Sequence, residues 1–398
     1  MRISLTRCRT RTPVGLDLGA SGWRAAQLVR QGVRVGLRAA VARTRSIENS
    51  DTAADSTSSA LERSLRAAPF RGRDVSCVLD PPAIEFFSLE LPAAVLSDPE
   101  LQHSDRGAEA DLAEMTRWEV ERMVGASAVG IEARHWALPP STVPGPNAIA
   151  VAAKRSEVLR LVELCHQAGW TCNRVDAGAA ALARFGSLLN RWNGEQVWGL
   201  LDVGFNESRV VLCVNDTPVL VRRAGSGGGA WTERVAEALQ VSVKAAEIHT
   251  RDHGIALAGR GVRREAPGMN AGAQGEAPSS ELAPILLGAL RTELREMASE
   301  IKRSYEYVLS RYPARHAADL VLVGNGSTLK NLPEFMSGAL GIVVRRASDY
   351  LGQDGCRLRV CPCRVGSGTC DKHRTLLTEQ WHTNIESLAQ AIGAAVTR

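Results

Sequence analysis

The chain has 398 residues, of which 44% are hydrophobic and 5% aromatic, and this length is enough for two domains with cores of their own. So few aromatic residues provide no stacking platform for single-stranded nucleic acid, and the formal net charge of +5 is modest, so we expect no nucleic-acid partner. The sequence contains no run of about 18 apolar residues and no apolar stretch of a signal peptide at its N-terminus, which indicates a cytoplasmic protein that does not span a membrane.

The first predicted elements are a basic tail and a three-stranded meander. Residues 1–12 carry four arginines ahead of the first strand, and we favour a solvated tail over contact with an anionic membrane surface. Apolar residues then recur in three short segments over residues 13–37, interrupted at Asp17-Leu18-Gly19 and at Arg30-Gln31-Gly32. This pattern predicts a meander whose first turn is the Asp-x-Gly.

A helix, a strand and an α+β block follow. The predicted elements are helix 58–68, strands 75–79 and 84–91, helix 108–123, strands 130–138 and 147–153, and helix 156–168. Asp80-Pro81-Pro82 ends the first of these strands, and the pattern of the sequence changes after it. We therefore expect residues 83–175 to form a small α+β subdomain inserted into a first lobe made of residues 13–82 and 176–195.

The meander pattern returns over residues 197–221, where Asp202-Val203-Gly204 again occupies the first turn. An apolar strand that runs into a glycine-rich turn presents backbone N–H groups to phosphate oxygens. An aspartate beside such a turn can hold Mg²⁺ through water, because Mg²⁺ prefers octahedral oxygen coordination. A single Asp-x-Gly is also ordinary hairpin chemistry, but its repetition favours a site that holds a nucleotide's phosphates from both sides.

The rest of the chain predicts mostly helices. An alanine-rich helix at 176–189 completes the first lobe, and residues 196–398 form the second. Helices are predicted at 231–239, 243–250, 282–310, from Pro333, and at 385–396, where small residues would let another helix approach closely. Residues 259–278 are rich in Gly, Ala and Pro, which is typical of a mobile loop.

Two glycine-rich turns of the second lobe are further candidate contacts for a ligand. Glycines cluster at 225–229 directly before a predicted helix, whose start offers N–H groups and a positive dipole end, although a hinge is a compatible interpretation. The buried strand predicted at 319–323 ends in Gly324-Asn325-Gly326-Ser327. A Gly-x-Gly alone is weak evidence, because many tight strand-to-helix turns need glycine.

Eight of the nine cysteines fall into two groups. Four single cysteines in apolar segments are expected to be reduced core residues, namely Cys77, Cys165, Cys172 and Cys213. The others lie within residues 356–373 ahead of one histidine: Cys356, Cys361, Cys363, Cys370 and His373. Their spacing lacks the paired C-x2-C of common zinc sites. A reduced insertion is favoured there, and metal binding stays open.

Several stretches together resemble one superfamily of nucleotide-binding proteins. They are residues 15–21, 150–154, 175–183, 201–204, 228–232, 300–304, 323–327 and 391–395. Their order is similar to the phosphate 1, phosphate 2 and adenosine motifs of the actin/Hsp70/sugar-kinase ATPases. Within that superfamily the chain most resembles the PilM-like proteins of type IV pilus assembly, which are related to the cell-division protein FtsA.

The resemblance implies an α/β, actin-like (ribonuclease H-like) two-lobed ATPase fold with an inserted α+β subdomain. It implies ATP and Mg²⁺ as cofactors, with Asp17 and Asp202 flanking the metal ion through water. Glu300 and Arg303 would approach the base or ribose. The full set of nucleotide-binding residues that it implies is Asp17, Gly19, Ala20, Ser21, Arg24, Asp202, Gly204, Phe205, Asn206, Gly228, Gly229, Glu300, Arg303, Gly324, Asn325, Gly326 and Ser327.

The implied role is that of a cytoplasmic ATP-binding adaptor, peripheral to the inner membrane, that binds the N-terminal tail of a PilN-like protein and other pilus assembly proteins. Hydrolysis is expected to be slow or absent, because no residue clearly orients an attacking water. Arg24 and Asn325 stand where the family usually has Lys and Gly, so a nucleotide-independent scaffold of a pilus or type II secretion system remains an alternative. A sugar-kinase-like phosphotransferase is another, although no aspartate before Asp176 stands in a convincing catalytic turn. The family provides no role for residues 259–278 or 356–373.

Overall fold

The computed structural model describes residues 10–44, 61–92, 106–125, 130–257, 281–360 and 385–396, apart from positions 33, 64, 67, 191, 193 and 314. Most of the basic tail, the segment 259–278, and Cys361, Cys363, Cys370 and His373 lie outside these residues. Within them, no helix is both long enough and apolar enough to pass through a bilayer.

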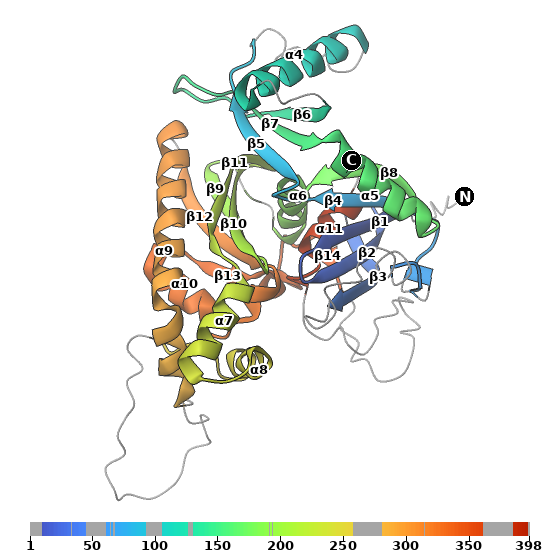
Figure 1. The fold of residues 1–398 in the computed structure, drawn as a ribbon. Coiled ribbons are helices and arrows are strands. Elements are labelled where there is room, and N and C mark those ends of the chain that lie inside the picture. Colours follow the sequence, from blue (N-terminus) through green and yellow to red (C-terminus); the bar gives the residue numbers. More distant parts are fainter. Residues whose placement is uncertain are drawn as a thin grey trace, which may run out of the picture.

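The first sheet has six strands in the order β14-β3-β2-β1-β4-β8 (Figure 1). Its strands are β1 (Thr10–Gly19), β2 (Gly22–Gln31), β3 (Arg34–Thr44), β4 (Asp74–Leu79), β8 (Thr171–Ala177) and β14 (Leu358–Arg359). The meander β1-β2-β3 is antiparallel, as predicted, and its Asp-x-Gly lies at the β1–β2 turn. Strands β4 and β8 add in parallel to β1.

The second sheet repeats this order as β11-β10-β9-β12-β13. Its strands are β9 (Gln196–Val203), β10 (Glu207–Val214), β11 (Thr217–Ser226), β12 (His316–Val323) and β13 (Val344–Arg346). The predicted meander β9-β10-β11 is again antiparallel, and β12 and β13 add in parallel to β9. The duplication seen in two short turns thus extends to whole sheets, so Asp17 and Asp202 come from equivalent strand ends.

Two helices lie between the sheets, α6 (Gly178–Leu189) and α11 (Ala389–Ala395). Trp198 and Leu200 of β9 face this layer, whereas their neighbours Val197 and Leu201 face the outer helices. The backbones approach closely, because a Cβ on Gly393 would overlap the carbonyl oxygen of Ala181 in α6. The prediction that small residues near the C-terminus allow close helix approach is confirmed.

The outer face of the second sheet is covered by helices. They are α7 (Gly228–Leu239), α8 (Val243–His253), α9 (Leu282–Arg311) and α10 (Leu332–Leu340). Two short 3-10 helices, η1 (Asn325–Thr328) and η2 (Ala347–Tyr350), flank α10 and β13. Each of the four helices agrees with a segment predicted from periodicity.

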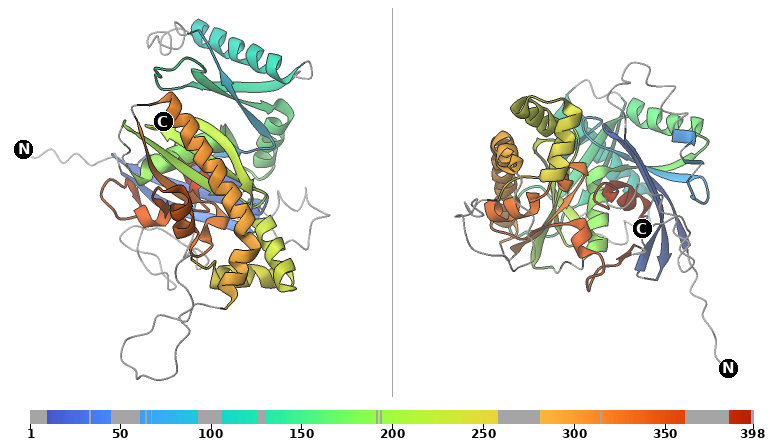
Figure 2. Two further views of the ribbon diagram at one scale, coloured as in Figure 1. Left: turned by 90° about the vertical axis from the view of Figure 1, so that its left-hand side faces the viewer. Right: turned by 90° about the horizontal axis from the view of Figure 1, so that it is seen from below.

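The predicted α+β block contains a three-stranded sheet in the order β5-β7-β6. Its elements are β5 (Ile84–Leu89), α4 (Arg106–Val124), β6 (Ile131–Ala137) and β7 (Ala148–Lys154). Figure 2 shows this part standing to one side of the two large sheets, with α4 on its outer side. We call it the inserted subdomain below.

Two assignments of segments to lobes differ from the sequence analysis. Strand β8 was not predicted, and it pairs with β4 of the first sheet although residues up to 175 were expected in the inserted block. Helix α5 (Arg155–Gln167) packs against β8 and shares its core. At the other end, β14 pairs with β3 and α11 packs on β1. The chain therefore returns to the first sheet after residue 350.

The inserted subdomain also contacts the second lobe. The indole Nε1 of Trp136 in β6 donates to the carbonyl of Pro218 at the start of β11, at 2.8 Å. At the end of α9, the Tyr312 hydroxyl donates to the Pro139 carbonyl at 3.2 Å, and Arg311 donates to the Pro146 carbonyl at 2.9 Å. The subdomain therefore bridges the lobes.

Candidate functional site

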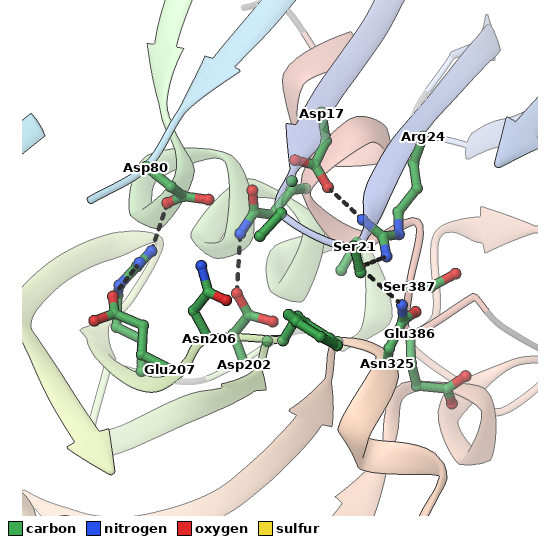
Figure 3. Close-up of a pocket in the computed structure, with 18 of the residues that line it drawn as sticks. Asp17, Ser21, Arg24, Asp80, Asp202, Asn206, Glu207, Asn325, Glu386 and Ser387 are labelled. Carbon is green, nitrogen blue, oxygen red and sulfur yellow. Dashed lines mark hydrogen bonds and ion pairs between the residues drawn. The ribbon is translucent and has the colours of Figure 1, made fainter. Parts of the chain in front are cut away.

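A cavity between the two sheets brings the predicted turns together (Figure 3). Its walls come from the β1–β2 turn, the end of β4, the β9–β10 turn, the turn after β12, and residues before and in α11. The lining residues are Asp17, Gly19, Ala20, Ser21, Arg24, Asp80, Pro81, Asp202, Gly204, Phe205, Asn206, Glu207, Arg209, Gly324, Asn325, Glu386, Ser387, Ala389 and Gln390.

The turn after β12 needs its first glycine. Gly324 has φ +82°, a backbone conformation that side chains rarely adopt. A Cβ there would overlap the Asp202 carboxylate and the Val203 carbonyl oxygen. Because β12 runs parallel to β9, this turn lies beside the end of β9, where it borders the cavity next to Asp202.

Three carboxylates from three strand ends surround the cavity. Asp17 is buried, and Asp80 and Asp202 lie close enough to it to act on its charge. Burial raises the pKa of Asp17 to about 7, against the effect of Arg24, and the two other carboxylates add to the rise. Burial likewise raises the pKa of Asp202, where Arg209 opposes it and Asp80 adds to it. Gathered carboxylates of this kind hold protons or bind a cation.

Two arginines partly neutralise these carboxylates. The Arg24 guanidinium lies 3.5 Å from a carboxylate oxygen of Asp17 and donates to the Ser21 hydroxyl at 3.0 Å. Arg209 reaches across the cavity to Asp80 of the first lobe at 2.5 Å and also contacts Glu207 at 2.9 Å. Its side chain is only 7% exposed. Burial disfavours its charge, but the carboxylates outweigh this and raise the pKa of Arg209.

Direct contacts across the cleft hold the lobes together. Besides the pair of Arg209 with Asp80, the side-chain amide of Asn325 donates to the Ser21 hydroxyl at 3.4 Å. From α11, the Gln390 amide donates to the Asp202 carboxylate at 2.9 Å. These hydrogen bonds close the cleft with side chains from both lobes and from α11.

The donors around the cavity fit the magnesium-bound phosphates of a nucleotide. Carboxylate oxygens are the ligands that Mg²⁺ prefers, and the backbone N–H groups of Phe205 and Asn206 donate no hydrogen bond within the described residues. The cavity has a volume of about 120 Å³, which is below the several hundred Å³ of ordinary small-molecule pockets. A whole nucleotide therefore requires the lobes to separate further than they do here.

The structure places the predicted site residues in three groups. Eleven of the seventeen line the cavity, namely Asp17, Gly19, Ala20, Ser21, Arg24, Asp202, Gly204, Phe205, Asn206, Gly324 and Asn325. Gly228 and Gly229 begin α7, and their N–H groups donate to the carbonyls of Gly204 and Phe205. Gly326 packs on Val203, and the buried Ser327 hydroxyl donates to the Gly324 carbonyl. These four residues support the turns from behind.

Glu300 and Arg303 do not line this cavity, and the position near the base or ribose that the resemblance implies for them stays a prediction. They pair with each other at 2.5 Å on the exposed side of α9, and Glu300 also pairs with Arg222 of β11 at 3.1 Å. Ion pairs with Arg303 and Arg222 lower the pKa of Glu300. The ion pairs of Glu300 are with Arg303 and Arg222, and neither arginine lines the cleft.

Sequence reasoning missed four important residues of the site: Asp80, Arg209, Glu386 and Gln390. Asp80 had a partial signal, because it is a carboxylate directly after an apolar strand; that this strand lies parallel to the strand containing Asp17 comes from the fold. The signal for Arg209 was weaker: it is a charged residue within the otherwise apolar strand β10, which is buried along nearly its whole length. Nothing local to the sequence indicated that α11 would reach Asp202.

Comparison with known proteins identifies the fold of this chain. No protein-family model and no curated protein sequence matches this chain. Among solved structures, a chain of the PilM–PilN type IV pilus biogenesis complex is 20% identical, with a TM-score of 0.67 over 96% of this chain and 97% of that one. Ethanolamine utilization protein EutJ from Carboxydothermus hydrogenoformans is 12% identical, with a TM-score of 0.49 over 97% and 89%. The chain therefore has the actin-like ATPase fold found in the pilus complex, which confirms the expected fold.

Proposed function

We propose that this protein is an ATP-binding adaptor of the type IV pilus assembly machinery, acting at the cytoplasmic face of the inner membrane. The observation that carries the proposal is the meeting of two equivalent strand ends, those of Asp17 and Asp202, across one cleft. The likeness in fold to a chain of the PilM–PilN complex supplies the biological setting.

In this proposal Asp17 and Asp202 hold Mg²⁺ through water, and Asp80 adds a third carboxylate. When bound, the metal ion offsets the negative charge of the phosphates. The N–H groups of Phe205 and Asn206 face the phosphates from the second lobe, and Asn325 lies on the adenosine side. Arg24 and Arg209 then have phosphate oxygens as alternative partners, which weakens their hold on Asp17 and Asp80.

Hydrolysis in such a site is slow or absent. A general base must lie within reach of an attacking water and be able to accept its proton. In this proposal Asp17, Asp80 and Asp202 all serve the metal ion, and Asp202 also accepts a hydrogen bond from Gln390, so none of the three is free to accept that proton. The arrangement favours a protein whose shape responds to bound nucleotide over one that turns nucleotide over.

The proposed partner is the N-terminal tail of a PilN-like inner-membrane protein. A second cavity of about 330 Å³ lies where the inserted subdomain meets α5 and β8. We call it the side groove; its walls combine apolar Val151, Val158 and Val162 with charged Glu132 and Arg134. An extended peptide with alternating apolar and charged residues suits these walls.

The inserted subdomain couples the two sites. One wall of the side groove belongs to β6 and β7, and the other end of the same sheet is bonded to the second lobe through Trp136 and Tyr312. When the lobes separate around a nucleotide, these bonds pull on the subdomain and change the width of the groove. Peptide affinity should then depend on nucleotide, and nucleotide affinity on peptide.

The first experiment measures ATP binding calorimetrically with Mg²⁺ present. We expect the wild-type protein to bind ATP, and the variants Asp17→Ala and Asp202→Ala to lose binding. The control variant Asp252→Ala, at an exposed aspartate near the end of α8, should keep ATP binding. The second experiment measures binding of a PilN-like tail peptide with and without Mg-ATP. Val158→Glu in the groove should abolish it, and its neighbour Leu159→Glu, which is 54% exposed, should not.

One observation favours a second candidate, a scaffold that works without nucleotide. The pair of Arg209 with Asp80 occupies the phosphate side of the cleft and fastens the lobes. If wild type shows no ATP affinity tighter than about 1 mM and still binds the peptide, the scaffold is correct and the ATP site is not.

A further inference from the structure

Three cysteines from three elements converge beneath the side groove. Cys77 lies in β4, Cys165 in α5 and Cys172 in β8. The Sγ atoms of Cys77 and Cys165 are 3.3 Å apart, those of Cys77 and Cys172 are 3.8 Å apart, and all three lie within 4.8 Å of one another. The sequence analysis treated each as a separate core residue, but the fold brings them together.

These separations suit three thiolates around one metal ion. A metal–sulfur bond of about 2.3 Å places the sulfurs of a flat trigonal site about 4.0 Å apart, and those of a tetrahedral site about 3.8 Å apart. A disulfide instead requires two of the sulfurs to approach to about 2.05 Å and leaves the third without a partner. The observed triangle is closer to a coordination site than to a bonded pair.

The environment of the cluster fits a soft ion. Cys77 and Cys165 are buried among apolar residues of the first lobe. Cys172 is partly exposed and lines the side groove, which gives an ion a way in.

The number of ligands selects the ion. Among the described residues, no histidine or carboxylate joins the three sulfurs. Soft thiolate ligands suit both Cu(I) and Zn²⁺, but structural zinc sites are almost always four-coordinate, and three sulfurs leave zinc without a fourth protein ligand. We propose that Cys77, Cys165 and Cys172 form a trithiolate site that binds one Cu(I) ion. Binding exchanges thiol protons for the metal ion, with no change in the oxidation state of copper or sulfur.

The site also joins elements that the proposed function needs. A metal ion held by β4, α5 and β8 ties the helix of the side groove to the last two strands of the first sheet, β4 and the edge strand β8. Copper bound there rigidifies one wall of the groove without touching the nucleotide cleft. The proposal itself does not depend on ATP or on a pilus partner.

The test uses the full chain under anaerobic, reducing conditions, in a background of Cys8→Ser, Cys361→Ser, Cys363→Ser and Cys370→Ser. Cu(I) is supplied as its coloured complex with bathocuproine disulfonate, and transfer to the protein is followed by loss of colour. We expect one Cu(I) per chain, with protection of Cys172 from alkylation. Zn²⁺ is titrated in parallel with a chromophoric indicator and should bind more weakly.

Single alanine variants of the three cysteines should each lose the copper equivalent. Cys213→Ala is the matched control for Cys77→Ala, because both thiols are fully buried in strands of a large sheet. If Cys77→Ala does not fold, the variant Cys172→Ala, at the partly exposed position, still tests whether copper binding requires the three cysteines. Copper uptake unchanged in Cys172→Ala, no uptake by the background protein, tighter binding of Zn²⁺ than of Cu(I), or a disulfide within the trio under these conditions would each overturn the proposal.

Discussion

The buried carboxylate of Asp17 should make the stability of the protein fall as pH rises through neutrality. Burial, with contributions from Asp80 and Asp202, raises its pKa from 3.8 to about 7. Below about pH 4 the folded and unfolded chains both hold the proton. Between pH 4 and 7 only the folded chain holds it, so the free energy of unfolding decreases with pH and the loss is complete above 7. At about 1.4 kcal/mol per pKa unit, a rise of about 3.2 units gives a total of at most about 4.5 kcal/mol.

Replacing Asp17 with Asn removes this titration. The variant should therefore lose less stability than wild type between pH 5 and pH 8, by about 2–3 kcal/mol, and it should be the more stable protein at pH 8. The assay is urea denaturation at several pH values without added metal. Asp252→Asn, outside the cleft, should keep the wild-type dependence.

Two results would refute this reasoning. If Asp17→Asn and wild type lose stability in parallel, the carboxylate is charged in the folded protein across this range and Arg24 outweighs its burial. If the variant is less stable at pH 8, the ion pair with Arg24 stabilises the fold instead. Proposed Mg-ATP binding adds a second readout, because affinity should increase as Asp17 loses its proton and should vanish in the variant.

Three further changes test the packing around the cleft. Arg209→Met should destabilise the protein by about 1–3 kcal/mol, because it leaves Asp80 without its partner, and adding Asp80→Asn should recover part of the loss in urea denaturation. Gly186→Ala should reduce the stability of the protein by about 1–3 kcal/mol, because the added Cβ overlaps the buried ring of Trp198. Thermal unfolding measures this loss, and the control Gly338→Ala, which has open space around it, should be unchanged or slightly more stable. Trp136→Phe removes the hydrogen bond from the indole to the Pro218 carbonyl of the second lobe. Amide hydrogen exchange in β5, β6 and β7 should then be faster by about fivefold, which corresponds to about 1 kcal/mol.

Local patterns predicted the parts of the site that are local. Each Asp-x-Gly turn connects strands that are neighbours in sequence, so alternation and turn chemistry were enough to find Asp17 and Asp202. Strand β8 was missed because three of its seven residues are exposed polar side chains and its partner β4 lies about 97 positions earlier. Its pairing is parallel, which no hairpin signal announces.

The remaining differences have the same physical origin. Asp80 was assigned only to the Asp-Pro-Pro segment that ends the strand 75–79, and only the parallel pairing of β4 with β1 shows that this end lies beside Asp17. Glu300 and Arg303 were assigned by resemblance, and their pairing with each other, three positions apart on an exposed helix face, follows from local helix geometry; their role near a nucleotide stays a prediction. Motif order identified the fold, whereas side-chain partners depended on contacts between distant segments.

The C-terminal segment around α11 makes the cleft dependent on late sequence. Gln390 holds Asp202, the Glu386 carbonyl accepts from the Gly324 N–H, and Arg184 of α6 donates to the Gly393 carbonyl. Both meanders can form from residues that precede it by more than 150 positions. A chain interrupted after residue 360 would thus possess both Asp-x-Gly turns but lack the segment that contacts Asp202 and Gly324. The spacing of the two turns is therefore set only once both lobes have closed on the last residues of the fold.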